Sequence, residues 1–235
     1  PDDRDPSSMR EAPQDYLAGL HQGISGLRVG WSPDLGFAAV DQEVAEVTAR
    51  AARVFQELGC HLEDAGVEMD DPFMVFWDIF RLQGYTSYGY ISDERPQDLT
   101  TYGKQSMEHG RAMSAPEYSR ALQSRVQLKR RMESLLERFD LLLTPTMAVT
   151  AFPIEKFPAE IGGRQVPAAW AYTPFTSLIN LSGQTAASIP CGFSSDGMPI
   201  GLHIVGRRGD EATVLRASAA FEQARPWAGR RPKVS

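Results

Sequence analysis

The chain has 235 residues, of which 42% are hydrophobic, so it is long enough to bury the core of one α/β domain. Its formal net charge of -6 argues against nucleic acid or an anionic membrane as a partner, because phosphate binding needs clustered Lys and Arg. The two cysteines, Cys60 and Cys191, lie far apart and form no CxxC pattern, which argues against a disulfide framework or a zinc site.

The first segment, residues 1–25, is rich in Asp, Pro and Ser. This composition predicts a linker, followed by a short helix around residues 16–20. The chain opens with Pro1 rather than Met, so we expect that a preceding segment of the protein is missing.

A β-α-β unit is predicted next. Residues 27–31 are a short apolar strand, and Asp41 can cap a helix whose apolar residues recur on one face. Gly59 ends this helix, and residues 61–69 are a second possible strand. Two such strands joined by a helix are expected to lie side by side in one sheet.

The middle of the chain predicts two helices, an aromatic-rich one over residues 71–90 and an Arg-rich one over residues 117–139. Between them, residues 91–115 mix Gly, Ser, Thr, His and Lys without clear periodicity. We interpret this stretch as a long surface loop of the kind that often borders a site.

In the last third, residues 140–146 have the continuous apolar run of a strand buried on both faces. Residues 161–166 predict a tight hairpin with a Gly-Gly turn. A short helix follows, with Thr173 as its expected cap, proline at its first position and Gly183 just past its end.

Two further strands, residues 186–190 and 199–206, are joined by a turn over residues 195–198. Asp210 then opens a closing helix that Pro226 ends.

Motifs for phosphate or metal binding are missing from this sequence. Gly201 and Gly206 have Walker A spacing, but Arg207 follows them in place of Lys and their interior predicts a strand. The four histidines form no HxxxH or HExxH pair. Their positions are His21, His61, His109 and His203. We therefore expect no metal and no cofactor.

Hydrolytic machinery is not evident either. No Gly-x-Ser-x-Gly elbow occurs, and Cys191 has no neighbour in sequence that would activate its thiol, so packing is its favoured role. A catalytic Ser-Lys pair needs a lysine in an apolar environment, which lowers the pKa of its amine. None of the lysines has one. They are Lys104, Lys129, Lys156 and Lys233.

One long stretch nevertheless resembles a known family. Residues 174–206, which contain Asn180-Leu-Ser-Gly-Gln-Thr-Ala-Ala-Ser-Ile-Pro-Cys-Gly192, are similar to the carboxyl-terminal signature of amidase-signature enzymes. Further similarities occur at residues 26–30, 139–146 and 210–215. The resemblance implies that residues 26–235 are the carboxyl-terminal portion of a single amidase-signature domain, an α/β fold whose mixed sheet is covered by helices on both faces.

The family resemblance also implies an activity, the hydrolysis of a linear carboxylic amide to an acid and an amine or ammonia through a serine acyl-enzyme. In that family one lysine and two serines form the catalytic trio, within a Gly/Ser-rich segment that this sequence lacks. The resemblance therefore assigns no catalytic residue here. The 235 residues alone are expected to be inactive, with the missing amino-terminal half as their partner.

What the resemblance leaves to this half is part of the pocket for a small amide substrate. The residues expected to line it are Thr144, Pro145, Trp170, Thr173, Phe175 and Ile179, for each of which simple core packing is the alternative.

Thr185 replaces the proline that is usual in the family, which should loosen the entry to the next strand. Thr173 stands near an Asp of glutamine-using subunits and so favours a free-standing amidase.

Other roles stay open at this point. The chain resembles the A-type subunit of glutamine amidotransferases as well, and a non-catalytic binding or partner module is a second alternative. A homodimer is a further possible assembly. The composition predicts neither nucleic acid nor a membrane as partner, and the cysteine usage predicts a cytoplasmic location. Without its other half, the chain should expose an apolar sheet edge and associate through it.

Overall fold

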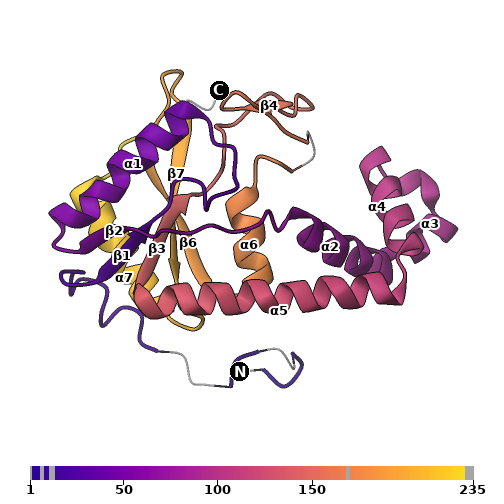
Figure 1. The fold of residues 1–235 in the computed structure, drawn as a ribbon, viewed down its shortest axis with the longest axis horizontal. Helices are drawn as coiled ribbons and strands as arrows, with labels where there is room; N and C mark the ends of the chain where they lie inside the picture. The colour runs from indigo at the N-terminus through magenta and orange to yellow at the C-terminus, as the bar shows by residue number, and fades with distance from the viewer. Residues whose placement is uncertain (1, 6–7, 11–13, 168–169, 231–235) are drawn as a thin grey trace.

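The computed structural model describes residues 2–5, 8–10, 14–167 and 170–230, which form a mixed α/β fold (Figure 1). Its main sheet has five strands in the order β2-β1-β3-β7-β6. Their bounds are β1 Arg28–Trp31, β2 His61–Asp64, β3 Leu141–Pro145, β6 Thr185–Phe193 and β7 Pro199–Gly206. Strand β1 runs parallel to β2 and β3, whereas β7 is antiparallel to β3 and β6. The predicted β-α-β unit and mixed sheet are confirmed.

The central strand β3 explains why the sheet needs cover on both faces. Leu141, Leu142 and Leu143 are all fully buried. Because side chains alternate across a strand, Leu142 packs into the core on one face while its two neighbours pack into the core on the other. A single uninterrupted apolar run is the expected signature of such a strand.

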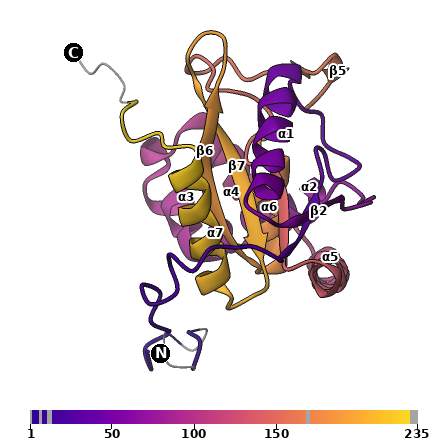
Figure 2. The same cartoon turned by 90° about the vertical axis from the view of Figure 1, so that its left-hand side faces the viewer.

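Helices α1 (Gln42–Glu57) and α7 (Glu211–Ala224) cover one face of the sheet, and Figure 2 shows them in front of the strands. Asp41 caps α1 as expected, accepting hydrogen bonds from the backbone N–H groups of Glu43 and Val44. Asp210 caps α7 in the same way, through the N–H group of Thr213. Both predicted helix starts are confirmed.

The opposite face is covered by α5 (Ala115–Arg138) and α6 (Pro174–Ser182), with α2 (Phe73–Tyr88) packed against them. Ser114 and Glu117 form a capping box at the start of α5. Gly183 ends α6 in the left-handed conformation with a φ of 79°. In Figure 1, α5 runs below the sheet and continues beneath α2.

The long loop predicted over residues 91–115 is wrong. This stretch forms α3 (Tyr90–Glu94), a 3-10 turn η1 (Pro96–Asp98) and α4 (Thr101–Ala112). Helix α4 contains two glycines, Gly103 and Gly110, and Tyr102 and Met107 are its only large apolar residues, so its sequence does not indicate a helix. It is stabilised instead by packing against α2, where Gly110 lets the two backbones approach closely.

Gly110→Ala should destabilise this helix pair. A Cβ atom at Gly110 would lie 2.5 Å from Cβ of Tyr85 and 2.6 Å from the carbonyl oxygen of Arg81. We expect a loss of about 1–3 kcal/mol in the free energy of unfolding, the usual effect of overpacking. Urea unfolding followed by circular dichroism measures it. Gly103→Ala on the same helix is the matched control, since its Cβ would meet nothing closer than 3.5 Å; equal losses in both variants would contradict this account.

Two smaller expectations have different outcomes. The Gly-Gly hairpin is confirmed as β4 (Glu160–Ile161) paired with β5 (Arg164–Gln165). The short helix around residues 16–20 is wrong, because these residues form turns. The strand expected over residues 61–69 is also shorter and ends at Asp64, since the chain leaves the sheet after it.

Strand β6 lies at one edge of the sheet and pairs only with β7 among the described residues. Ala186 and Ser188 on this strand are exposed. An edge strand presents a row of unpaired backbone N–H and C=O groups that can pair with another strand. At nine residues β6 is the longer of the two edges of this sheet, the other being β2 with four residues, and further strands can add along it.

Candidate functional site

The carboxyl end of β3 carries the first two residues predicted from the sequence. Thr144 and Pro145 are both buried, and the Thr144 hydroxyl donates to the carbonyl oxygen of Pro145 at 2.8 Å. In the sheet register, Thr144 lies opposite His203 on β7, which in turn lies opposite Ser188 on β6. A polar stripe therefore crosses three strands and ends at the open edge.

His203 is the unusual member of this stripe. It is only 5% exposed, and its Nδ1 atom has no hydrogen-bond partner among the described residues. Burial lowers the pKa of His203 to about 4, because the charged imidazolium is poorly solvated there. The ring is therefore neutral at pH 7.

Beside His203, two hydroxyl groups bridge the end of β3 and the edge strand. Oγ1 of Thr146 lies 2.8 Å from Oγ of Ser188. Gly201 makes this approach possible, since a Cβ atom there would lie 2.8 Å from both oxygens. Ser188 is exposed and lies on the edge strand β6, so the hydroxyl pair is located at the edge of the sheet.

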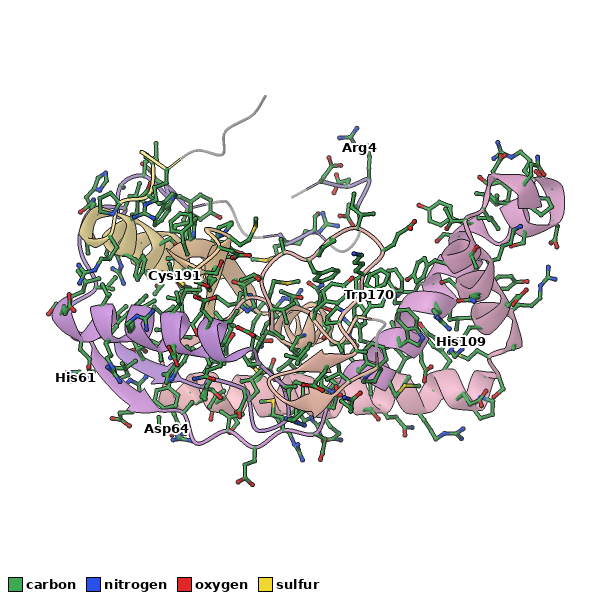
Figure 3. All side chains as sticks on the ribbon, turned by 90° about the horizontal axis from the view of Figure 1, so that it is seen from above. Arg4, His61, Asp64, His109, Trp170 and Cys191 are labelled. Carbon is green, nitrogen blue, oxygen red and sulfur yellow. The ribbon has the colours of Figure 1, made fainter. Side chains whose placement is uncertain are left out.

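Rings from three separate segments form an aromatic cluster next to the end of β3. Its members come from α2, from α4 and from the loop between β3 and α6. They are Phe73, Phe76, Trp77, Phe80, Tyr102, Phe152, Phe157, Trp170 and Tyr172. Trp170 is the centre of the cluster, with its ring centroid within 6.4 Å of four other rings. Figure 3 shows Trp170 toward the side of the molecule where helix α4 carries His109, and far from Cys191.

The backbone at Trp170 is held in an unfavourable conformation. Its φ of 66° lies in the left-handed region, which is rare for a bulky residue. Thr173 holds it there, because both its backbone N–H and its hydroxyl donate to the Trp170 carbonyl oxygen at 2.9 Å. Thr173 is the N-cap residue of α6 as expected, although its side chain makes no capping hydrogen bond to the helix.

The remaining two predicted residues lie elsewhere. Phe175 and Ile179 are buried in the hydrophobic core between α6 and α5. Of the six predicted residues, Trp170 alone lines one of the cavities described below. The structure thus brings Trp170 and Thr173 together beside the end of β3, while Phe175 and Ile179 occupy core positions below them.

Two cavities flank the stacked pair Trp170 and Tyr172. The smaller, which we call the aromatic cavity, has a volume of about 140 Å³. Its walls include three rings, from Phe37, Phe73 and Trp170, together with small apolar residues, two prolines and four polar residues. The polar residues are Asp71, Arg164, Gln165 and Ser177. The larger, of about 440 Å³, lies between Phe152, Tyr172 and the start of β7. Sequence reasoning missed the roles of Phe73 and Tyr172, because only the fold brings their segments together.

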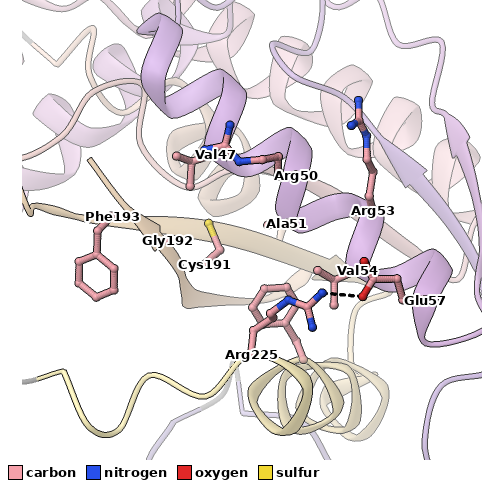
Figure 4. Close-up of a pocket in the computed structure, with 11 residues that line it drawn as sticks. Val47, Arg50, Ala51, Arg53, Val54, Glu57, Cys191, Gly192, Phe193 and Arg225 are labelled. Atoms are coloured by element: carbon pink, nitrogen blue, oxygen red, sulfur yellow. Dashed lines mark hydrogen bonds and ion pairs between the residues drawn. The ribbon is translucent and has the colours of Figure 1, made fainter. Parts of the chain in front are cut away.

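A third cavity lies on the other face of the sheet, between α1, α7 and the end of β6 (Figure 4). We call it the arginine pocket, because Arg50, Arg53 and Arg225 line its walls, and its volume is about 450 Å³. Arg225 forms an ion pair with Glu57 at 2.6 Å. Cys191 lies on the floor, where burial raises the pKa of its thiol to about 12. A thiol in this state is not a nucleophile at pH 7.

The described lysines lie at the surface of the fold. Lys104 and Lys156 are exposed, and Lys129 lies 3.7 Å from Glu133 on the same helix. Lys233 is outside the described residues. Two adjacent serines follow β6, of which Ser194 bonds to Asp196 and the backbone, and Ser195 bonds to Glu43. Over the described residues, no group of three or more His, Cys, Asp or Glu side chains is arranged to hold a metal ion.

The fold is that of amidase-signature enzymes. A crystal structure of a bacterial aryl acylamidase of that family matches 98% of this chain with a TM-score of 0.86 and 30% sequence identity, and the chain covers 51% of it. The family model named Amidase matches residues 1–215, and the chain belongs to the Amidase family. The resemblance seen in the sequence is thereby confirmed.

Curated relatives agree in family and differ in activity. An acylamidase of Rhodococcus erythropolis is 32% identical over the whole chain, and the A-type subunit of a glutamyl-tRNA(Gln) amidotransferase from Chloroflexus aggregans is 31% identical. The chain spans about half the length of each, 50% of the first and 52% of the second. No helix in the described part of the chain is long and apolar enough to cross a membrane.

Proposed function

We propose that this chain is the carboxyl-terminal half of an amidase that hydrolyses a linear carboxylic amide to an acid and an amine or ammonia. The observation that carries the proposal is the match to acylamidases over half of their length, and the exposed or ion-paired positions of the described lysines support it. The lysine and the two serines would come from the amino-terminal half, and the reaction would pass through a serine acyl-enzyme.

In this proposal, the chain supplies the scaffold and one wall of the substrate site. The amino-terminal half would extend the sheet along β6, whose backbone groups are free to pair on that side. The exposed Ser188, bonded to Thr146, would then lie at the junction of the halves. Thr144, Pro145, Trp170 and Thr173 remain the proposed wall on this side.

The arginine pocket lies beside the same strand, with Cys191 on β6 forming part of its floor. Three arginines and one glutamate leave an excess of positive charge there in an otherwise acidic chain. Carboxylates of the amino-terminal half would complement these guanidinium groups. The unpaired cysteines, Cys60 and Cys191, support a cytoplasmic location.

Reassembly of the two halves tests the proposal. The chain alone should not hydrolyse an amide above the buffer rate, whereas the full-length protein, or the chain mixed with its amino-terminal half, should release product. Ammonia or amine release is measured directly. A matched full-length variant without the lysine of the Gly/Ser-rich segment should be inactive, and the chain alone should elute as an associated species in gel filtration.

Other results would favour the alternatives. Activity of the chain alone would contradict the assignment of the catalytic groups to the other half. If full-length protein released ammonia from glutamine only together with further subunits, it would be an A-type amidotransferase component. A full-length protein without the lysine and serines, binding amides but hydrolysing none, would be a binding module.

A further inference from the structure

The aromatic cavity has the size and the walls of a site for one aromatic ring. Its volume is about 140 Å³, and an apolar cavity of about 150 Å³ in another protein is known to take up benzene. Phe37, Phe73 and Trp170 supply ring surfaces, and Pro167 and Pro174 supply further apolar walls. A few polar groups accompany them, as in most small-molecule sites.

The polar part of the cavity is held in place by the backbone. Arg164 donates from its two terminal nitrogens to the carbonyl oxygens of Ala38 and Phe37, each at 3.2 Å. Its guanidinium therefore has a fixed position at the wall. Ser177 on α6 lines the cavity as well, and its hydroxyl donates to Pro174 at 3.1 Å. These contacts fix the shape of the cavity before any ligand arrives.

Two independent sets of contacts hold Trp170 in position before a ligand binds. The rings of Trp77, Phe80, Tyr102 and Tyr172 surround it, and Thr173 holds its backbone in the left-handed conformation. Unfavourable backbone conformations of this kind concentrate at ligand-binding and active sites. Because the Trp170 ring is already ordered, stacking a ligand ring on it costs little conformational entropy. More of the stacking free energy therefore contributes to the affinity for the ligand.

The cluster is not a closed core. Phe80 and Tyr102 are each 42% exposed, although both contact Trp170. Rings that serve only to fill a protein interior are covered by their neighbours, whereas this group leaves apolar surface open beside a cavity. The cluster also adjoins the end of β3, because the backbone N–H of Ala148 donates to the carbonyl oxygen of Tyr172.

We propose that the amide substrate of this protein carries an aromatic ring, which the aromatic cavity binds between Phe73 and Trp170. This inference rests on the proposed amidase function and names the substrate class. A planar ring gains stacked or edge-to-face contacts with both side chains, whereas a saturated ring of the same carbon count is thicker and gains only apolar contact. The cavity therefore selects aromatic over alicyclic amides.

The test compares benzamide with cyclohexanecarboxamide, a matched pair that differs only in the ring, as substrates of the full-length protein. We expect kcat/KM to be roughly five- to tenfold higher for benzamide, the advantage that aromatic pairs provide. Phe73→Leu should bring this ratio close to one. Tyr88→Leu is the control, because Tyr88 lies on the same helix, is 59% exposed and is outside the aromatic cluster; it should keep the ratio.

Binding measured by thermal shift distinguishes a failure of the aromatic selectivity from a failure of the amidase function. A ratio near one in the unchanged protein, or a ratio that survives Phe73→Leu, would overturn the aromatic selectivity and leave the amidase function standing. Stabilisation by benzamide without hydrolysis of either amide would reject the amidase function and retain the aromatic site. If the rings instead seat the amino-terminal half, Phe73→Leu would weaken reassembly and leave the ratio unchanged.

Trp170→Phe provides a second variant in case Phe73→Leu fails to fold. It keeps an aromatic face in the same wall, so the preference for benzamide should persist, while Trp170→Leu should lose it. Loss of the preference in both variants, or its survival in both, would contradict a stacking role for this ring.

Discussion

Leu142→Ala is expected to lower the free energy of unfolding by about 3–5 kcal/mol, the range found for leucine truncation in well-packed cores. Leu142 lies in the central strand β3, is fully buried, and packs with Phe175, Leu178 and Val205 in the core between the sheet and helices α5 and α6. Truncation removes apolar contacts and leaves a cavity that the sheet backbone cannot close. Such a loss is a large part of the total stability of a typical domain.

Urea unfolding followed by circular dichroism measures this loss. Val126→Ala on α5 is the control, because Val126 is 48% exposed and its truncation should change stability by no more than about 0.5 kcal/mol. Similar midpoints for the two variants would show that β3 does not lie at the centre of the core.

Asp140→Asn should lower stability by roughly 2 kcal/mol at pH 7 and by much less near pH 2. The Asp140 carboxylate accepts hydrogen bonds from Arg28 at 3.0 Å and from Arg207 at 3.1 Å, and also from the Arg28 backbone N–H. These contacts, above all that with Arg28, lower the pKa of Asp140 to about 2. Arg207 also donates to Leu136 and Phe139, so the carboxylate ties β1, β7 and the end of α5 together.

The direction of the pH dependence follows from this pKa. Because the folded-state pKa is below the unfolded value of about 4, the contribution of Asp140 is complete above pH 4. It is lost as the pH falls from about 4 to about 2. Stability curves of the two proteins should therefore converge in acid. Asp98→Asn, which removes an exposed pair with Arg95 at 3.6 Å, should have little effect at any pH; a constant gap between Asp140→Asn and the unchanged protein would contradict this account.

Local patterns predicted most elements of this fold. The apolar run of residues 140–146, the capping residues Asp41 and Asp210, and the end of α6 at Gly183 each act through the nearest few residues, and all appear where expected. Where local patterns were weak, prediction failed. Helix α4 depends on the contact of Gly110 with α2, a contact that its own sequence does not reveal.

The candidate site was less predictable. Trp170 was expected to line a pocket, and it does line the aromatic cavity. Thr173 was expected to cap α6 and is its N-cap residue, but its hydroxyl donates to the Trp170 carbonyl oxygen and makes no capping bond. This carbonyl lies only three residues back, and a capping pattern does not distinguish between such local side chain-to-backbone bonds.

The family and the order of most helices and strands could be predicted from local patterns, because a motif and a cap are properties of neighbouring residues. The tertiary structure was needed to show which rings meet around Trp170, which of the six predicted pocket residues lie in the core, and which strands form the edges of the sheet. These are relations between segments far apart in the chain, fixed by packing and by the sheet order β2-β1-β3-β7-β6.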